Sequence, residues 1–525
     1  MLVILSISLL VITSLVMLIL RISRPGFGYH WLIAAGGALV TWIAVLLLGI
    51  SLPVSVQLIN WGPETTYPNS FILIADQISW PFAVGLGTLI LATLLTDVVR
   101  AFKMDWSNWA SSLVVTALGW ISVFSGNLLT FILAWTAFDI IALVILLSQL
   151  QSGKSRRRAI WVFFSRLLGS SCLLIAGVIS VNDNGSYLLE RASPAAITFV
   201  VLAAGLRLGL IPADAPFTDN QTSRRSHGTV FSLISATIVL VFLVRVALAL
   251  ETVELATNLW GILFTLTGLV SLLSGGIWLL AHDELEGRQA FILGMSAIVV
   301  AATLRAQAEA SLSWALALLF SGGLIFLSSV RTKFSMWITL LGLVGISTLP
   351  FTPAWNIFTL FGFPLNLSLV LYLITMIFMI WGYAHHASQL KPEPFGLERW
   401  IKVVYPLGLL IIPIVQISFF WFHLPEFSEV PLMGWIIGPL ICMLALTGFF
   451  WQRKGGKVNQ LMAMRINAIF SLGWIYAILR TIYDYFSRFI HFISKVLEGE
   501  GGLLWVLLWI VLILALLVIN IGPSS

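Results

Sequence analysis

Ionisable residues inside long apolar stretches are the first candidates for chemistry in this sequence. Asp139 lies in the middle of SGNLLTFILAWTAFDIIALVILL, which runs from Ser125 to Leu147. A charge at the centre of a helix in a bilayer costs about 2.5–3.5 kcal/mol, so such residues pair with one another or face water. We expect a buried charge network made of Asp76, Asp97, Asp139, Arg166, Arg207, Asp214 and Arg245.

The sequence leaves two interpretations of Asp139 open. The carboxylate can accept and release a proton, or it can be a structural counter-ion to Arg166 or Arg207 that ties helices together. Arginine does not give up its proton in proteins. The structural interpretation is therefore favoured for Arg207, and Arg166 and Arg245 share this limit.

The composition predicts an all-α polytopic membrane protein. Of the 525 residues, 59% are hydrophobic and 10% are charged, whereas soluble domains carry about 25% charge. Apolar runs recur along the chain and predict about 16 transmembrane helices. We interpret the first run, Leu2 to Leu20, as a retained span. Cys172 and Cys442 fit no metal, haem or disulfide pattern and no nucleotide fingerprint is present, so we expect no cofactor, no metal and no catalytic centre of its own.

The net charge of +6 indicates membrane orientation and does not indicate nucleic-acid binding. Lys and Arg cluster in alternate loops, whereas the intervening loops carry mostly acids. By the positive-inside rule, the N-terminus lies outside, in what we expect to be a prokaryotic cytoplasmic (inner) membrane. The basic loops contain, among others, Arg21, Arg24, Arg100, Lys103, Lys154, Arg156, Arg157, Arg158, Arg224, Arg225, Arg288, Arg331, Lys333, Lys391 and Arg453.

Two apolar runs are interrupted by proline at corresponding places in the chain. GLRLGLIPADAP contains Pro212, and GISTLPFTPAW contains Pro350 and Pro353. Interrupted spans at matching positions are typical of inverted-repeat transporters. Their freed carbonyls need water or protein partners, so broken helices line cavities.

The chain divides into five expected regions. Residues 1–107 hold three N-terminal helices, 108–250 a first repeat, 251–386 a second and degenerate repeat, and 387–457 additional helices. In residues 458–525, a charged stripe predicts an amphipathic lateral helix before the last span. The stripe consists of Arg480, Asp484, Arg488, His491 and Lys495.

Several of these motifs, in this order, resemble a known family. ILIADQISWPF, SGNLLTFILAW, FFSRLLGSSCLLIAG, LRLGLIPADAPF, FSLISATIVLV and ISTLPFTPAWN are similar to segments of the antiporter-like subunits of respiratory complex I and the Mrp sodium/proton antiporters. The resemblance spans about residues 70–360 and implies two inverted five-helix repeats with broken helices, a lateral helix and a last span.

The sequence departs from this family at the residues that carry charge. The family has a glutamate after the helix-five tryptophan; here Thr136 follows Trp135, and the acid appears at Asp139. The family's helix-seven lysine matches Arg207, and its helix-eight histidine matches Ser235. Its helix-eleven and helix-twelve polar positions match Leu312, Leu316, and Asn356 or Ile357. A continuous relay through both halves is therefore not expected.

Three function hypotheses follow. The first is a proton- or sodium-translocating subunit of a multi-subunit membrane complex, with a charged path only in the first half. It could serve a proton-translocating NAD(P)H or ferredoxin:quinone oxidoreductase with a hydrophilic redox arm. The second is a non-conducting structural or anchoring subunit. The third is the membrane subunit of a DAB-type bicarbonate uptake complex, beside a zinc-containing carbonic-anhydrase-like partner. All three place other membrane subunits and the lipid bilayer around the chain.

Overall fold

The computed structural model divides into two compact units, Met1–Gly456 and Lys457–Ser525. It describes residues 1–59, 71–103, 105–150, 152–184, 193–210, 221–251, 258–361, 367–391, 398–422 and 432–454, with Thr481, Tyr485 and Arg488. Apart from these last three residues, the expected lateral helix and last span lie outside the described residues, as do Pro212 and Asp214.

The N-terminal half of this unit is helical, with one short pair of strands. Its elements are α1 (Leu2–Ser23), α2 (His30–Leu48), η1 (Gly49–Ser51), β1 (Val54–Ile59), β2 (Phe71–Ala75), α3 (Ser79–Asp97), η2 (Val98–Lys103), α4 (Trp106–Val123), α5 (Leu128–Gln149), α6 (Gly153–Asn184), η4 (Pro194–Ala196), α7 (Ile197–Leu208), α8 (Gln221–Arg225) and α9 (His227–Leu250).

The second half continues with helices alone among the described residues. Its elements are α10 (Asn258–Leu280), α11 (Arg288–Leu304), α12 (Ala308–Leu327), α13 (Lys333–Ile346), η5 (Trp355–Phe361), α14 (Leu369–Ala387), α15 (Ile401–Phe422) and α16 (Leu432–Arg453). Pro350 and Pro353 lie in the non-helical stretch between α13 and η5. Because proline cannot donate a backbone hydrogen bond, this stretch cannot continue α13 as a regular helix.

The protein is an all-α integral membrane protein. Within the described residues, 11 helices are long and apolar enough to cross a membrane, and three further apolar helices are shorter. The apolar run that begins at Phe71 becomes helical only at Ser79. Phe71–Ala75 instead forms β2, which pairs antiparallel with β1, from Val54 opposite Ala75 to Ile59 opposite Phe71. Its run of β-branched and aromatic residues suits a strand as well as an apolar helix.

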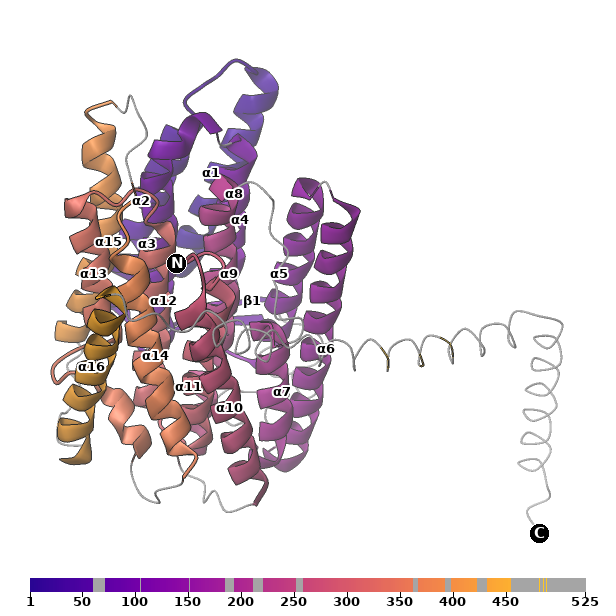
Figure 1. The fold of residues 1–525 in the computed structure, drawn as a ribbon. Helices are drawn as coiled ribbons and strands as arrows, with labels where there is room; N and C mark the ends of the chain where they lie inside the picture. The colour runs from indigo at the N-terminus through magenta and orange to yellow at the C-terminus, as the bar shows by residue number, and fades with distance from the viewer. Residues whose placement is uncertain are drawn as a thin grey trace, which may run out of the picture. The chain divides into compact units, whose positions relative to one another are not determined.

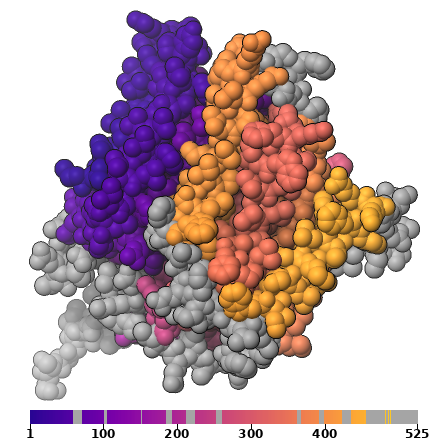
Figure 2. Space-filling model, turned by 90° about the vertical axis from the view of Figure 1, so that its left-hand side faces the viewer, coloured from indigo at the N-terminus to yellow at the C-terminus, as the bar shows by residue number. Residues whose placement is uncertain are grey.

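Three helices form the centre of the bundle. In α3, α9 and α12, 83–89% of the membrane-length window is buried, and the three contact one another. α5, α6 and α7 lie at one margin of the bundle, and α13, α15 and α16 lie at the other (Figure 1). On the latter side, α15 lies between the N-terminal helices and α13 (Figure 2), where it packs against α3 and α13.

Two sets of five helices repeat one pattern of neighbours. In the first set, α4, α5, α6, α7 and α9, each helix packs against the next and α9 returns to α4. In the second set, α10, α11, α12, α13 and α14, each helix again packs against the next and α14 returns to α10. Each set is therefore a closed ring, and α9 and α12 bring the two rings into contact.

The close approach of α16 to the α13–η5 break leads to a stability prediction. A Cβ added at Gly438 would overlap the backbone carbonyl oxygen of Thr348, whose hydroxyl donates to the Gly438 carbonyl oxygen at 3.0 Å. Backbone cannot yield as a flexible side chain does, so Gly438→Ala should cost about 1–3 kcal/mol. The check is the thermal unfolding midpoint in detergent, followed by tryptophan fluorescence.

Gly36, in α2, supplies the matched control. Nothing lies within 4 Å of a Cβ added there, so Gly36→Ala should leave the midpoint unchanged or raise it slightly, because alanine is the better helix former. Equal midpoints for the two variants would show that α16 does not pack this closely on the break.

Candidate functional site

Asp139, near the middle of α5, lies between two arginines from the next two helices. Its Oδ2 is 2.5 Å from Nη1 of Arg207 on α7, and its Oδ1 is 3.4 Å from Nη1 of Arg166 on α6. The carboxylate is buried, the Arg207 side chain is fully buried, and the Arg166 side chain is 15% exposed. The structure therefore brings together three residues that the sequence singled out, and one acid faces two cations.

The local structure orients Arg207 toward this acid. Trp135 lies one turn before Asp139 on the same face of α5, and the guanidinium carbon of Arg207 lies 4.0 Å from the Trp135 ring centroid. Arg207 is in the last turn of α7, where the helix dipole favours a cation. Gly209, with φ of 87°, ends the helix in the left-handed conformation that glycine adopts at little cost.

Asp76 forms a second ion pair at the start of α3. Its Oδ1 accepts hydrogen bonds from the backbone N–H groups of Ile78 and Ser79 at 3.2 and 2.7 Å, which satisfies donors at the start of the helix. Its Oδ2 is 2.9 Å from Nη2 of Arg245 near the end of α9. Asp76 and Arg245 therefore join α3 to α9, away from Asp139.

Asp97 forms a third cluster at the other end of α3. The fully buried carboxylate accepts hydrogen bonds from Arg100 at 2.8 Å, from the Trp109 indole at 3.2 Å and from the Ser226 hydroxyl. Next to Ser226, His227 begins α9, and its Nδ1 lies 2.9 Å from the Ser112 hydroxyl. These contacts join α3, α4 and α9 at the end that carries the basic loops.

A pocket borders the arginine side of the Asp139 cluster. It has a volume of about 50 Å³ and is lined by residues of α5, α6, α7, α8, α9 and α11, among them Arg166, Arg207, His227 and Ser235. A water needs about 10–15 Å³ of such space, so the pocket has room for a few waters. Among the residues that the structure describes, no group of three or more His, Cys, Asp or Glu side chains could hold a metal ion.

Sequence analysis missed a charge cluster beside the start of α11. Glu284 is fully buried in the loop between α10 and α11, and its carboxylate contacts Arg225 at 2.6 Å and Lys391 at 2.5 Å. Arg331 lies at 3.5 Å, and neighbouring Asp283 contacts Lys391 at 3.0 Å. The available signal was the acidic pair in HDELEGR, inside one of the loops expected to be basic. His227, within SRRSHG, carried no signal beyond its residue type.

Burial and charge push the pKa values of these two acids in opposite directions. Burial by itself raises the pKa of Glu284, but the hydrogen bond with Asp283 and the charges of Arg225, Arg331 and Lys391 outweigh it and hold the pKa well below its usual value. Burial, followed by the hydrogen bond with Glu284 and its charge, raises the pKa of Asp283 above its usual value. Of the two acids, Asp283 is therefore the more readily protonated.

Apart from Arg207, the residues at the positions that match the family's polar residues are uncharged in this chain. Ser235 lines the pocket, and Leu312 and Leu316 pack against the core. Asn356, in η5, donates from its side chain to Glu309 at 3.3 Å, and Ile357 is fully buried. The second ring thus lacks an equivalent of the Asp139 cluster among its described residues.

The fold of this chain is similar to that of chains in solved membrane complexes. No family model matches the sequence, and no curated protein does either. A chain of the Mrp complex from Dietzia sp. matches with a TM-score of 0.72 at 13% identity, over 100% of this chain and 63% of that chain. A chain of the membrane-bound sulfane sulfur reductase, an archaeal respiratory membrane complex, matches with a TM-score of 0.66 at 14% identity, over 97% of this chain and 100% of that one.

A third match is also a chain of a membrane complex, at similarly low sequence identity. A chain of respiratory complex I from Thermus thermophilus aligns with a TM-score of 0.55 at 17% identity, over 81% of this chain and 100% of that one. This chain has the antiporter-like fold. The resemblance drawn from the motifs is confirmed for the fold. The antiporter-like fold continues past residues 70–360, where the motifs were found, and spans about 63% of the matched Mrp chain.

The opposite pKa shifts of Glu284 and Asp283 predict opposite effects on stability. A lowered pKa in the folded state stabilises the protein above the usual glutamate value of about 4.3, and this contribution is lost as the pH falls below that value. Glu284→Gln should therefore destabilise the protein at pH 7 by about 3–5 kcal/mol, because Arg225 and Arg331 lose their acidic partner and Lys391 loses one of its two. The difference in unfolding midpoint between variant and parent should shrink below about pH 4.

Asp283→Asn is the matched test at the adjacent position. A raised pKa in the folded state means that the charged form opposes folding above the usual aspartate value of about 3.9. The variant should be as stable as the parent or more stable at pH 7, and its advantage should vanish in acid. A loss of stability like that of Glu284→Gln would show that Asp283 acts as a charged partner of Lys391.

Proposed function

We propose that this chain is a subunit of a multi-subunit membrane complex and that it translocates protons through its first ring of helices, with Asp139 as the proton-binding group. The single observation that carries the proposal is the Asp139 cluster: an acid held among three apolar helices by arginines from α6 and α7. Ionisable residues at such depth are expensive, and where they occur they commonly mark ion pathways.

The composition of the cluster favours protons over sodium. Arg166 and Arg207 keep their protons, so Asp139 is the only group of the three that can bind and release one. Hard cations require several oxygen ligands, whereas Asp139 is surrounded by guanidinium groups. A metal cation placed here would meet two positive charges and one carboxylate.

The pocket supports access from the end that carries the basic loops. It reaches from Gln149 at the end of α5 to Arg207 and Ser235 deeper in the bundle, and its volume allows a short chain of waters. By the positive-inside rule this end faces the cytoplasm and the N-terminus lies outside. A proton would then reach Asp139 when an arginine moves off one carboxylate oxygen.

A second candidate function rests on the same contacts. Both oxygens of Asp139 contact groups that cannot pass a proton. Between Lys333 and Lys391 the sequence holds no Asp, Glu, Lys or Arg. On these grounds the chain could be a structural or anchoring subunit of the complex, with Asp139 as a fixed counter-ion.

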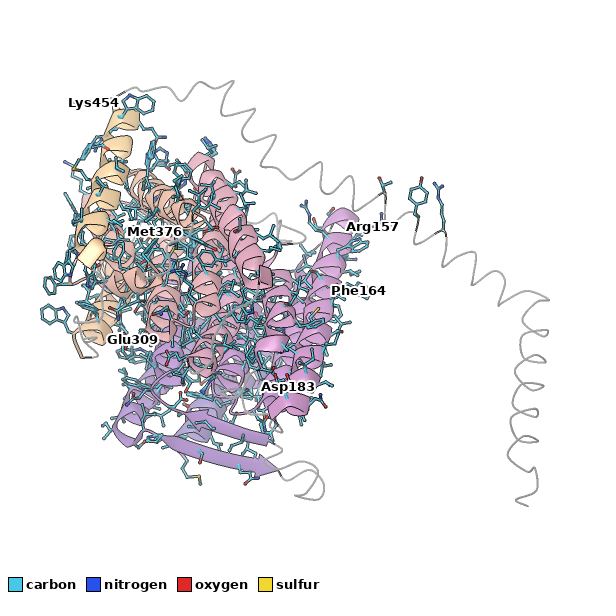
Figure 3. All side chains as sticks on the ribbon, turned by 90° about the horizontal axis from the view of Figure 1, so that it is seen from below. Arg157, Phe164, Asp183, Glu309, Met376 and Lys454 are labelled. Atoms are coloured by element: carbon cyan, nitrogen blue, oxygen red, sulfur yellow. The ribbon has the colours of Figure 1, made fainter. Side chains whose placement is uncertain are left out.

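The partners are proposed from the fold neighbours and the lipid-side surface. The matched proteins belong to respiratory and Mrp complexes, and the outer sides of α5 and α6 expose large apolar side chains such as Val144, Phe164 and Val178. α6 runs from near Arg157 to Asp183 at the margin of the bundle, with Phe164 on its outer side (Figure 3). This surface suits lipid or a neighbouring membrane subunit.

Affinity purification in mild detergent would distinguish a hydrophilic redox arm, Mrp-type partners and a zinc-containing protein.

Asp139→Asn tests the proposed function in the assembled complex. The substitution removes the proton-binding group while nearly preserving its shape, so proton translocation into sealed vesicles should be abolished with the complex still assembled. Translocation is measured with a pH-sensitive dye, and assembly with native gels.

The matched control is Asp76→Asn, which removes the acid that pairs with Arg245 and joins the start of α3 to α9. It should reduce stability without abolishing translocation per assembled complex. Unchanged translocation in Asp139→Asn would rule out the proposed function. Loss of assembly with normal translocation in the complexes that remain would favour the anchoring subunit.

A further inference from the structure

The pocket beside the Asp139 cluster carries an excess of positive charge. Arg166 and Arg207 line it, and no acidic side chain is among its described lining residues. Asp139 neutralises only one of the two arginines that contact it. A buried positive excess in an apolar bundle is costly unless a negative group compensates it.

Several polar atoms at the wall of this pocket are buried and have no hydrogen-bond partner among the described residues. They are Nε and Nη2 of Arg207, Nε2 of His227 and the hydroxyl oxygen of Ser235. Arg207 is 2% exposed, His227 is 2% exposed and Ser235 is 4% exposed. Leaving such a group unsatisfied destabilises the protein, and more so when the group is charged.

The free edge of Arg207 has the geometry that recognises an oxyanion. Nη1 is bound to Asp139, and one face of the guanidinium lies against Trp135. The remaining nitrogens, Nε and Nη2, form the fork that donates two parallel hydrogen bonds to a pair of oxygens on one atom. This edge can therefore hold an oxyanion while the ion pair with Asp139 stays intact.

The size and surroundings of the pocket limit the ligand. The pocket has room for a few waters and therefore for a planar ion with a few heavy atoms. Arg156, Arg157 and Arg158 lie near the start of α6, next to the end of α5 that the pocket reaches. Clustered basic residues raise the local concentration of anions at such an entrance.

We propose that this pocket binds a small monovalent oxyanion, of the size of formate or bicarbonate, through Nε and Nη2 of Arg207, with the Ser235 hydroxyl and His227 as further hydrogen-bonding groups. The anion compensates the second arginine charge and occupies the inner end of the pocket. This inference does not depend on proton translocation, because the anion satisfies the same unpaired groups in a non-conducting subunit.

The test measures thermal unfolding of the purified full chain in detergent, at constant sodium concentration and ionic strength, with formate or bicarbonate replacing gluconate. Unfolding is followed by the reaction of Cys172 and Cys442 with a thiol-reactive fluorophore. Formate and bicarbonate should raise the midpoint in a saturable way, whereas the larger gluconate should not. A midpoint independent of the anion would overturn the proposal.

Paired variants separate the pocket from general effects of charge. The double variant Asp139→Asn with Arg207→Gln removes the fork and its acid together and should abolish the effect of formate. The charge-matched control, Asp76→Asn with Arg245→Gln, lies outside the pocket lining and should retain it. Retention in the first double variant would overturn the proposal.

Two single variants keep the test independent of folding defects. Ser235→Ala removes one hydroxyl from the wall and should weaken the apparent affinity for formate about tenfold.

Asp214, in residues 211–220, which the structure does not describe, is an acid close to Arg207 in sequence. If Asp214→Asn gains a formate dependence that the parent lacks, a carboxylate of the chain itself fills the pocket and the proposal is wrong.

Discussion

A charge in an apolar helix bundle must be paired with an opposite charge. At the margin of the protein, Asp139 satisfies this constraint by contacting Arg166 and Arg207. α6 packs mainly against α5 and α7, and only 28% of its membrane-length window is buried. Apolar side chains of similar size give such a helix little reason to prefer one rotation about its axis in lipid. The ion pairs from Asp139 to Arg166 and Arg207 therefore determine which faces of α6 and α7 turn inward.

The same constraint acts at both ends of the central helices. Asp76, before α3, pairs with Arg245 near the end of α9, and Asp97, at the end of α3, bonds to Ser226 just before α9. The two helices are thus joined antiparallel at both ends by polar contacts, with an apolar interface between. A shift of α9 along its axis would break one contact or the other. If helices of the first ring move, we therefore expect α5, α6 and α7 to move more easily than α9.

The helices, their order and the charged residues in them could be predicted from the sequence, because hydropathy and charge act locally. The start of α3 could not: a run such as FILIA fits a strand or a helix equally well, and only its pairing with Val54–Ile59 decides between them. The pairing of Asp139 with both arginines was open as well, since Arg166 and Arg207 are 27 and 68 residues away. Glu284 was missed because its three cations come from separate segments, which only the folded chain brings together.

The two rings share their pattern of neighbours but are held together by different chemistry. In the second ring, hydroxyl groups take the place of charges: the Tyr383 hydroxyl bonds to the carbonyl oxygens of Ser321 and Thr339 at 3.2 Å each, and the Tyr372 hydroxyl bonds to that of Phe264 at 2.7 Å. These bonds join helices without placing an ion in the bundle, and a phenol bonded to a backbone carbonyl is a poor proton carrier at neutral pH. Among the described residues, the second ring therefore repeats the shape of the first without repeating its acid–arginine contacts. If this chain moves ions within its complex, we expect the step that binds them in the first ring, where two arginines contact an acid among apolar helices.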